Sequence, residues 1–412
     1  MKELNIKKFD LNRLNLKKLE LGENKLVLKK TTYEGPIVQD GRLIGKDGKP
    51  TGTKGDMYTK VIMDHILQDG TLDHNPRPHY EDFYEGATYD KVNNVVTTKE
   101  GNIINIGEKE SVHEKENGVE IWTPAHTLSV NTGVECTYDL SKGETPMITL
   151  RPIAAKTGCK EILLIYQKES SDLVVFDEML GIRTWDDNKP ASENEIHNWW
   201  KDWAVRDENG DYVLNENNHP DIFNCYGGTT KKRHMLHRYV IDVIKGSIEK
   251  GIKPNPDCRR LIACLWQYED FEKPHGLKPC AFLTIWNVRH GWDGKDYLDM
   301  TLIQRSSDFG TAGCINQVQY ADLLIMVARE VGMEPGYFTW KPINVQIYDR
   351  HIDQAIEMLE REPVDGIDAT IKLNENATSF DEMTADDIKI LDKEAIQKIK
   401  TKNPQLKFQL GI

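Results

Sequence analysis

Apolar positions recur with the spacing of an α-helix in several separate segments of the chain. In residues 56–70 they fall on one helical face, and Gly70 is a residue type that suits the end of a helix. The same spacing predicts further helices over residues 154–166, 235–250, 320–331 and 353–361. Each of these helices is expected to pack an apolar face against a core.

Short runs rich in β-branched and aromatic residues predict strands elsewhere in the chain. They cover residues 26–28, 41–48, 127–150, 261–266, 280–288, 297–304 and 345–348, and the tail 406–412 is also strand-like. Residues 186–233 are rich in Trp, Asn, Asp and Gly and predict a loop-rich layer. Strands and helices mix without a strict βαβ rhythm, which predicts an α+β or mixed α/β fold around one large sheet.

The pattern divides the chain into an N-terminal extension and a main domain. Residues 1–54 predict a β-rich extension, with a linker or loop at 45–55, and residues 55–412 form the main domain. Within the main domain, residues 79–126 are polar and irregular. They predict an insertion of long loops or β-hairpins at the surface.

Composition narrows the class of protein. The chain has 412 residues, of which 39% are hydrophobic and 29% charged, as in an ordinary globular protein with a sizeable core. No apolar run approaches the roughly 20 residues of a membrane span, and the first residues show no signal-peptide core, so we expect a cytoplasmic protein. A net charge of −13 argues against nucleic acid as a partner.

The seven cysteines are scattered along the chain. They form no CxxC pair and no Cys/His cluster with zinc spacing, so we expect no bound metal. Their odd number fits a reducing compartment, where disulfides are rare.

One cysteine stands near residues that suggest chemistry. Cys280 lies at the start of an apolar strand, and residues 304–308 supply an amide, an arginine, two hydroxyls and a carboxylate. A thiol near an anion-binding arginine suggests covalent chemistry on a phosphorylated substrate. Taken alone, a cysteine in a strand is more often a small buried hydrophobe, so the other motifs decide between the two interpretations.

Several spaced motifs match one family. They are Asp257-Cys258-Arg259-Arg260, Lys278-Pro279-Cys280, Gln304-Arg305-Ser306-Ser307-Asp308, Asn316 with Tyr320, and Gln346-Ile347-Tyr348. In order and spacing they resemble the motifs of the thymidylate synthase family, which includes the phage pyrimidine-nucleotide hydroxymethylases. The resemblance covers residues 56–412 and is densest over 255–350. Weaker matches upstream are Arg77, Arg151, Glu161, Trp185 and Tyr226.

The resemblance implies a folate-dependent one-carbon transfer to C5 of dUMP. The thiolate of Cys280 would add to C6 of the pyrimidine, and C5 would then attack the methylene group of the co-substrate 5,10-methylenetetrahydrofolate. Glu161 would organise the water and protons of the reaction, and Arg305 would favour the thiolate. The catalytic residues implied are Cys280, Glu161, Tyr226 and Arg305.

The same resemblance implies two sets of binding residues. The nucleotide would be bound by Arg77, Arg259, Arg260, Gln304, Arg305, Ser306, Asn316, Gln346 and Tyr348. The folate would be bound by Arg151, Trp185, Leu277 and Asp308. The Asn316 amide offers a donor and an acceptor that match uracil, whereas cytosine-specific relatives carry Asp there. Arg259 and Arg260 would come from the partner subunit, so the expected assembly is a two-fold homodimer.

The chain departs from the family pattern at two site positions. Ala281 replaces the usual His after the nucleophile, and Gln346 replaces the His of a His-x-Tyr motif. These departures bear on how the exocyclic methylene intermediate is quenched. Water gives 5-hydroxymethyl-dUMP and tetrahydrofolate, whereas hydride gives dTMP and dihydrofolate.

Because the chain keeps Asn316 but departs from the common pattern, we expect a phage dUMP hydroxymethylase that acts in the host cytoplasm. Thymidylate synthase is the alternative. A dCMP-specific hydroxymethylase and a non-catalytic nucleotide-binding relative are further alternatives. Residues 1–54 and 79–126 could also form a docking surface for other enzymes of nucleotide synthesis.

Overall fold

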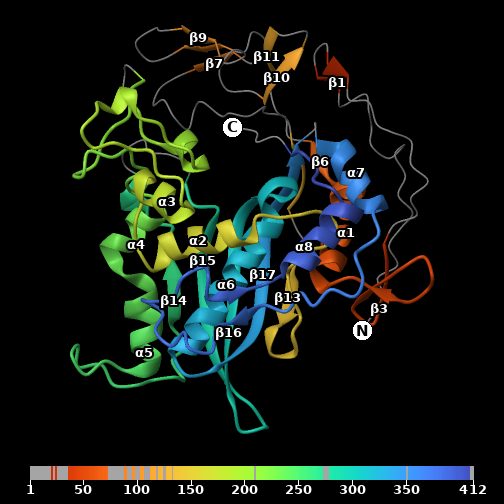
Figure 1. Cartoon of the computed structure of the whole chain (residues 1–412), viewed down its shortest axis with the longest axis vertical. Coiled ribbons are helices and arrows are strands. Elements are labelled where there is room, and N and C mark those ends of the chain that lie inside the picture. The colour runs from red at the N-terminus through yellow and green to blue at the C-terminus, as the bar shows by residue number, and fades with distance from the viewer. Residues whose placement is uncertain are drawn as a thin grey trace.

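A large mixed sheet runs through the middle of the molecule, with helices packed along it and smaller sheets at its periphery (Figure 1). The computed structural model describes residues 20–21, 24–25, 36–72, 88–90, 95–97, 103–105, 112–116, 119–123, 127–131, 133–207, 210–271, 278–348 and 351–408. Among these residues, no helix has both the length and the apolar composition needed to cross a membrane.

Seven described strands form the central sheet, in the order β14-β15-β16-β17-β12-β6, with β13 paired to the first half of β17. They are β6 Thr71–Leu72, β12 Thr127–Val130, β13 Cys136–Asp139, β14 Leu261–Cys264, β15 Ala281–His290, β16 Asp296–Asp308 and β17 Glu334–Tyr348. β15 and β16 form an antiparallel hairpin, whereas β16 and β17 run parallel and are joined through a helix. The predicted α+β fold around one large mixed sheet is confirmed.

Helix α6 is the central helix of the molecule. The described helices are α1 Lys54–Asp69, α2 Ala155–Tyr166, α3 Leu173–Leu180, α4 Gly227–Arg233, α5 Asp242–Lys245, α6 Cys314–Glu330, α7 Ile352–Glu360 and α8 Lys393–Lys402. α6 packs against β16, β17 and α2, so it is buried along most of its length and its sequence is strongly apolar. Gly158 lets α2 approach closely, because a Cβ there would lie 2.9 Å from the Ile315 side chain.

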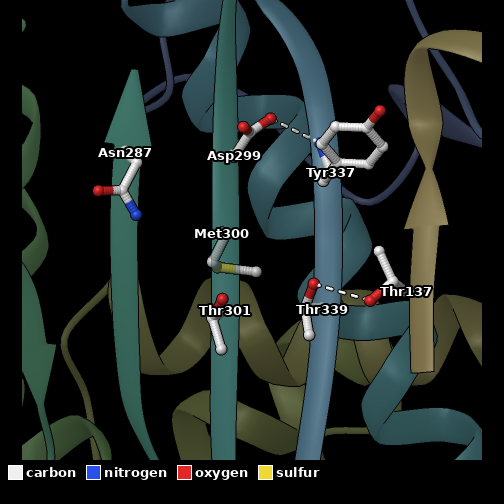
Figure 2. A pocket seen from close by; sticks show the side chains of 7 residues that line it. All are labelled: Thr137, Asn287, Asp299, Met300, Thr301, Tyr337 and Thr339. Carbon is white, nitrogen blue, oxygen red and sulfur yellow. Dashed lines mark hydrogen bonds between the residues drawn. The ribbon is translucent and has the colours of Figure 1, made fainter. Parts of the chain in front are cut away.

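The two faces of the central sheet differ in character. Trp286, Leu302, Phe338 and Trp340 are fully buried under the helices. Alternate residues of the same strands face the other way. With β13 they line a hollow at which Thr137, Asn287, Asp299, Thr301, Tyr337 and Thr339 lie (Figure 2). Met300 also borders the hollow, but it is buried and is the cross-strand partner of Trp286.

Small sheets account for the described parts of residues 1–54 and 79–126, the predicted extension and insertion. The extension contains the antiparallel strands β3 Ile37–Gln39, β4 Arg42–Ile44 and β5 Pro50–Thr51, and the pair β1 Glu20–Leu21 and β2 Asn24–Lys25. The insertion contains the sheet β7 Thr88–Asp90, β8 Val95–Thr97 and β9 Ile103–Asn105, and the hairpin β10 Val112–Glu116 and β11 Val119–Thr123. A further pair is β18 Lys372–Leu373 and β19 Ile388–Lys389.

One predicted strand lies outside the described residues, and another is not formed by its described part. The strand predicted at residues 26–28 lies outside the described residues. In the strand-like tail, residues 406–408 join no strand, and 409–412 lie outside the described residues.

The predicted helix at residues 235–250 is shorter and less regular in the structure. It consists of a π-helical turn, His237–Ile241, followed by α5, and it stops at Gly246. Gly246 has a φ of +77°, and a Cβ there would lie 2.7 Å from the Pro254 ring. The backbone at this glycine, and not the apolar pattern, sets the end of the helix.

Strand β17 is longer than the segment 345–348 that the pattern predicts. Its earlier part contains Pro335, Gly336 and Pro342, residue types that are uncommon inside strands. Gly336 is required for a close approach to β16, because a Cβ there would lie 1.9 Å from Oδ1 of Asp299.

Helix α1 begins inside the stretch that is expected to be a linker. The Thr53 hydroxyl accepts a hydrogen bond from the Asp56 N–H at 3.0 Å, and the Asp56 carboxylate accepts one from the Thr53 N–H at 2.9 Å. The buried Asp56 carboxylate also accepts from the Thr149 N–H at 2.6 Å and from its hydroxyl at 2.8 Å. This carboxylate therefore joins the start of α1 to the segment that precedes α2.

Replacing Asp56 by alanine is expected to lower the free energy of unfolding by about 2–4 kcal/mol, because the helix loses its cap and the Thr149 N–H loses its acceptor. Urea unfolding followed by circular dichroism measures the loss. Asp69→Ala, at the exposed end of the same helix, is the control and should cost less than about 0.5 kcal/mol. Equal losses in the two variants would contradict this role of Asp56.

Candidate active site

The predicted nucleophile lies where a loop enters β15. The Cys280 N–H donates a hydrogen bond to the Tyr226 hydroxyl at 3.0 Å, and the Ala281 carbonyl accepts one from the Tyr320 hydroxyl at 3.2 Å. The Cys280 carbonyl accepts from the Arg305 N–H at 2.9 Å, next to a bulge in the register of β15 and β16. Three hydrogen bonds thus fix the backbone around a cysteine that is partly exposed.

Tyr226 reaches the nucleophile because of an unusual backbone turn. Its φ is +44°, which is rare for a residue with a side chain, and α4 begins directly after it. A Cβ on Gly227 would lie 1.8 Å from the Ser170 carbonyl oxygen. A Cβ on Gly228 would lie 1.6 Å from the Phe223 carbonyl oxygen. The turn therefore requires both glycines. Burial raises the pKa of Tyr226 far above its ordinary value, so its hydroxyl stays protonated.

Arg305 lies beside the nucleophile. Its Nε donates to the Pro279 carbonyl at 3.0 Å, and its Nη2 donates to the Lys278 carbonyl at 2.7 Å. The guanidinium lies 5.5 Å from the centroid of the Trp266 ring. A guanidinium has five N–H donors, so these two hydrogen bonds leave others for a phosphate group.

Three donors surround the carboxylate of Glu161 on α2. Its Oε1 accepts from the indole N–H groups of Trp199 at 3.0 Å and Trp200 at 2.7 Å, and its Oε2 accepts from the Gln319 amide at 3.3 Å. Burial raises the pKa of Glu161, and these hydrogen bonds oppose the rise. The opposing effects suit a group that both takes up and releases a proton.

An aromatic cluster connects Glu161 to the nucleophile. The Tyr226 ring stacks with Trp200 at a centroid distance of 6.1 Å and with Trp203 at 6.4 Å. The 3₁₀ turn that carries the tryptophans starts at the buried Asn198, whose side chain accepts from the Trp200 N–H at 3.1 Å. The Trp200 indole therefore contacts both Glu161 and Tyr226, and Tyr226 is hydrogen-bonded to Cys280.

The predicted base-reading residue, Asn316 on α6, belongs to the same site. Its Oδ1 accepts from the Gln304 amide at 3.1 Å, and its Nδ2 donates to Oε1 of Gln319 at 2.9 Å. Gln319 lies one helical turn further along α6 and reaches Glu161. The structure thus brings together Gln304 and Asn316, both of which the motifs predict, and joins them to Glu161.

Two predicted folate residues lie around the turn that follows β16. Asp308 accepts from the Thr311 N–H at 3.3 Å, and burial raises the pKa of Asp308 to about 6. Arg151 donates to the Gly310 carbonyl at 2.7 Å, and its guanidinium lies 5.0 Å from the Phe408 ring of the C-terminal tail. A carboxyl group, a guanidinium and an aromatic ring therefore meet at one turn.

The predicted sugar residues lie on the neighbouring strand. Gln346 of β17 stands opposite Asp308 in the parallel register, and Tyr348 packs edge-on against His351 at 5.4 Å. Both Gln346 and Tyr348 are buried. The predicted nucleotide and folate residues thus share one edge of the β16–β17 pair.

Five predicted residues are not brought into this group by the described chain: Arg77, Trp185, Arg259, Arg260 and Leu277. Arg259 and Arg260 are exposed in the turn before β14 and make no hydrogen bond or ion pair with other described residues. Arg77 and Leu277 lie outside the described residues.

Sequence reasoning missed the residues that hold Glu161. They are Trp199, Trp200 and Gln319. A signal for the tryptophans is present: three tryptophans within residues 199–203 are too dense for an ordinary loop unless they share a packing surface. Trp185, predicted to lie beside the folate, packs edge-on against His219 at 6.0 Å.

The structure places Arg305 beside Cys280 and connects Cys280 to Glu161 through Tyr226 and Trp200, as expected for the family that the motifs resemble. A family model described as thymidylate synthase matches residues 101–403. The chain therefore belongs to the thymidylate synthase family, as its motifs predict, and is an enzyme of that family.

Individual relatives agree with this assignment. The chain is 36% identical over 281 residues to the thymidylate synthase of Lactococcus lactis subsp. lactis, covering 68% of this chain and 86% of that protein. It is 33% identical over 361 residues to the thymidylate synthase of Streptococcus suis, covering 87% of this chain and 100% of that protein. The thermostable thymidylate synthase A from Bacillus subtilis shares the fold, with a TM-score of 0.55 and 22% identity over 87% of this chain and 99% of that chain.

Replacing Tyr226 by phenylalanine is expected to slow alkylation of Cys280 by iodoacetamide about tenfold, because the Cys280 N–H loses its acceptor and the loop is no longer fixed. Mass spectrometry of the modified peptide gives the rate. Tyr58→Phe is the matched control, since the Tyr58 hydroxyl also accepts a backbone N–H, from Thr137 at 3.2 Å. An unchanged alkylation rate in a folded Tyr226→Phe variant would contradict the role of this hydroxyl.

Proposed function

We propose that this protein is a thymidylate synthase, which methylates C5 of dUMP with the one-carbon unit of 5,10-methylenetetrahydrofolate and releases dTMP and dihydrofolate. The connected group of Cys280, Tyr226, Glu161 and Asn316 carries the proposal. It combines a nucleophile, a proton-transfer group and a pyrimidine-reading amide. The names of the relatives from Lactococcus lactis and Streptococcus suis favour the same reaction.

The first step is addition of the Cys280 thiolate to C6 of the pyrimidine, which turns C5 into an enamine-type nucleophile. The cation of Arg305, one strand pairing away, favours the thiolate and offers further N–H donors to the phosphate. The backbone hydrogen bonds at Cys280 and Ala281 keep the sulfur in place during the attack.

Recognition of the base is assigned to Asn316. In the protein its Oδ1 accepts one hydrogen bond and its Nδ2 donates one. An amide has room for one more of each, so one acceptor remains for N3–H of uracil and one donor for O4. Cytosine presents the opposite pattern at these positions, which favours dUMP over dCMP as the substrate.

Glu161 is assigned the proton transfers. Its Oε1 already accepts two indole N–H groups, whereas Oε2 accepts one amide. The proton is therefore taken up and released at Oε2, where a lone pair remains. Opening the folate ring and removing the C5 proton both need such a group.

The turn after β16 suits the folate. A carboxyl group with a pKa of about 6, as Asp308 has, can accept or donate near neutral pH, and a pterin edge carries both donors and acceptors. Arg151 and Phe408 add a cation and an aromatic face beside it. We therefore assign Asp308 and Arg151 to the folate side of the site.

The last step separates two candidate functions. The indoles of Trp199, Trp200 and Trp203 surround Glu161 and Tyr226, and an aromatic wall leaves few polar anchors for the water that hydroxymethylation requires. This favours quenching by hydride. The second candidate is the dUMP hydroxymethylase expected from the sequence, and the departure from the family pattern at Ala281 favours it. The two reactions share every step before this one.

Incubating the purified protein with dUMP and 5,10-methylenetetrahydrofolate is expected to yield dTMP and dihydrofolate in equal amounts. Mass spectrometry identifies the nucleotide, and absorbance follows the dihydrofolate. Cys280→Ser should abolish turnover and any covalent adduct, because a hydroxyl is a far weaker nucleophile than a thiolate. Formation of 5-hydroxymethyl-dUMP with tetrahydrofolate would favour the hydroxymethylase over the thymidylate synthase. Absence of both products would contradict both candidate functions.

A two-fold dimer is the second part of the proposal. The sheet face opposite the helices carries a cross-strand row, partly visible in Figure 2, of Ile262, Ile285, Thr301, Thr339 and Thr137. Several large apolar side chains are exposed on these strands: Ile262 (39%), Tyr337 (38%) and Ile343 (47%). Such a face is typical of a surface that a second copy covers, and members of the family act as dimers.

Mixing two inactive variants tests whether Arg259 and Arg260 cross the interface. Cys280→Ser lacks the nucleophile, and a variant with both arginines changed to alanine lacks the donated cations. An equimolar refolded mixture should regain about a quarter of the wild-type activity, because half of the dimers are mixed and each holds one complete site. Each variant alone is the control. No regain despite mixed dimers would contradict the donation.

A further inference from the structure

A row of hydrogen bonds crosses the site from the central sheet to Glu161. The Trp340 indole on β17 donates to Oε1 of Gln304 at 2.8 Å, and Gln304 donates to Asn316 at 3.1 Å. Asn316 donates to Gln319 at 2.9 Å, and Gln319 donates to Glu161 at 3.3 Å. Trp340, Gln304 and Gln319 are buried, with 0%, 2% and 2% of their surfaces exposed.

In each of the four hydrogen bonds, the donor is the residue nearer to Trp340 and the acceptor is the residue nearer to Glu161. The groups at the two ends, an indole and a carboxylate, both require this direction. The Trp340 indole can only donate, so it selects the oxygen of Gln304 and turns the Gln304 NH₂ group toward Asn316. An ionised carboxylate can only accept, so Glu161 selects the NH₂ group of Gln319. Reversing one amide would place two donors or two acceptors face to face in a buried site, which is costly.

We propose that Gln319 is a positioning residue that couples the reading of uracil by Asn316 to the ionised state of Glu161. This inference rests on the proposed function, in which Asn316 reads the base. The row fixes one of the two orientations of the Asn316 amide. Cytosine has an acceptor at N3 and a donor at N4, so it needs the other orientation, which the row excludes.

The coupling follows from what protonation does to the end of the row. A proton on Oε2 of Glu161 can turn this oxygen into a donor that faces the NH₂ group of Gln319. Gln319 then has no acceptor on that side, and its hold on Asn316 weakens. Ionised Glu161 thus keeps the uracil-reading orientation in place.

Among the described residues, the titratable neighbours of Glu161 do not change their charge when Glu161 is protonated. The titratable side chains that face Glu161 from neighbouring elements are Tyr226 and Tyr320. Burial raises the pKa of both tyrosines far above the ordinary value, so both stay neutral. The partners of Oε1, Trp199 and Trp200, carry no charge. Glu161 is therefore the member of the row whose charge changes with pH.

Gln319→Met keeps the approximate volume of the side chain and removes both hydrogen bonds. We expect the ratio of dUMP to dCMP affinity, measured by calorimetry without folate, to fall about tenfold. We also expect the pKa of Glu161 to rise by about half to one unit. Difference infrared spectroscopy follows this protonation, with Glu161→Gln to assign the carboxyl band. The direction follows because the ionised carboxylate loses a donor.

Gln317→Met is the matched control. Gln317 is on the same helix and is 3% exposed, but it bonds to Tyr138 at 2.7 Å and to the Gly313 carbonyl at 3.2 Å, outside the row. It should leave the affinity ratio and the infrared titration unchanged. Equal effects in the two variants would reveal a merely structural role of Gln319 and overturn the proposal.

Trp340→Phe provides a second test if Gln319→Met does not fold. It removes only the donor that orients Gln304, so the affinity ratio should fall while the titration of Glu161 shifts less. Wild-type values in the row variants would overturn the proposal. Neither readout needs turnover, so a protein that binds dUMP but makes no dTMP refutes the proposed function alone. If wild-type protein binds neither nucleotide, the infrared titration still tests the link from Gln319 to Glu161.

Discussion

The hydrogen bond from the Cys280 N–H to the Tyr226 hydroxyl is the interaction on which the rest of the site depends. It exists because Tyr226 accepts a φ of +44° and is followed by two glycines whose backbones touch Ser170 and Phe223. The same tyrosine ring stacks with the indoles that hold Glu161. Cys280 and Glu161 are therefore positioned by one turn, which links them without direct contact.

The second requirement is a scaffold that holds uncharged polar groups in fixed directions. Helix α6 is wedged between the sheet and α2, so Gln317 and Gln319 are buried and bond to neighbouring protein groups. Asn316 and Gln319 satisfy each other and reach one neighbour each. Burial and directionality together fix the orientation of these amides, with few charges involved.

Local motifs predicted the parts of the site that lie on one strand or one turn. Cys280 and Arg305 are cross-strand neighbours on a hairpin, and Gln304 precedes Arg305. Their spacing in the sequence therefore predicts that they lie close together in space. Trp199 and Gln319 could not be found in this way, because they come from a loop layer and a central helix that meet only after packing. The sheet was predicted in outline, but the prolines and glycine of β17 concealed half of that strand.

The alternation of side chains along β16 has a consequence for how this chain can vary. Gln304 faces α6, whereas its neighbour Arg305 faces the loop that carries the nucleophile. Gain or loss of a single residue within the strand would exchange these two directions and remove the contacts of both side chains. Evolution can therefore change residue types in the central strands but must place added length outside them. An engineer who wants to graft a peptide onto this enzyme should choose a site outside these strands.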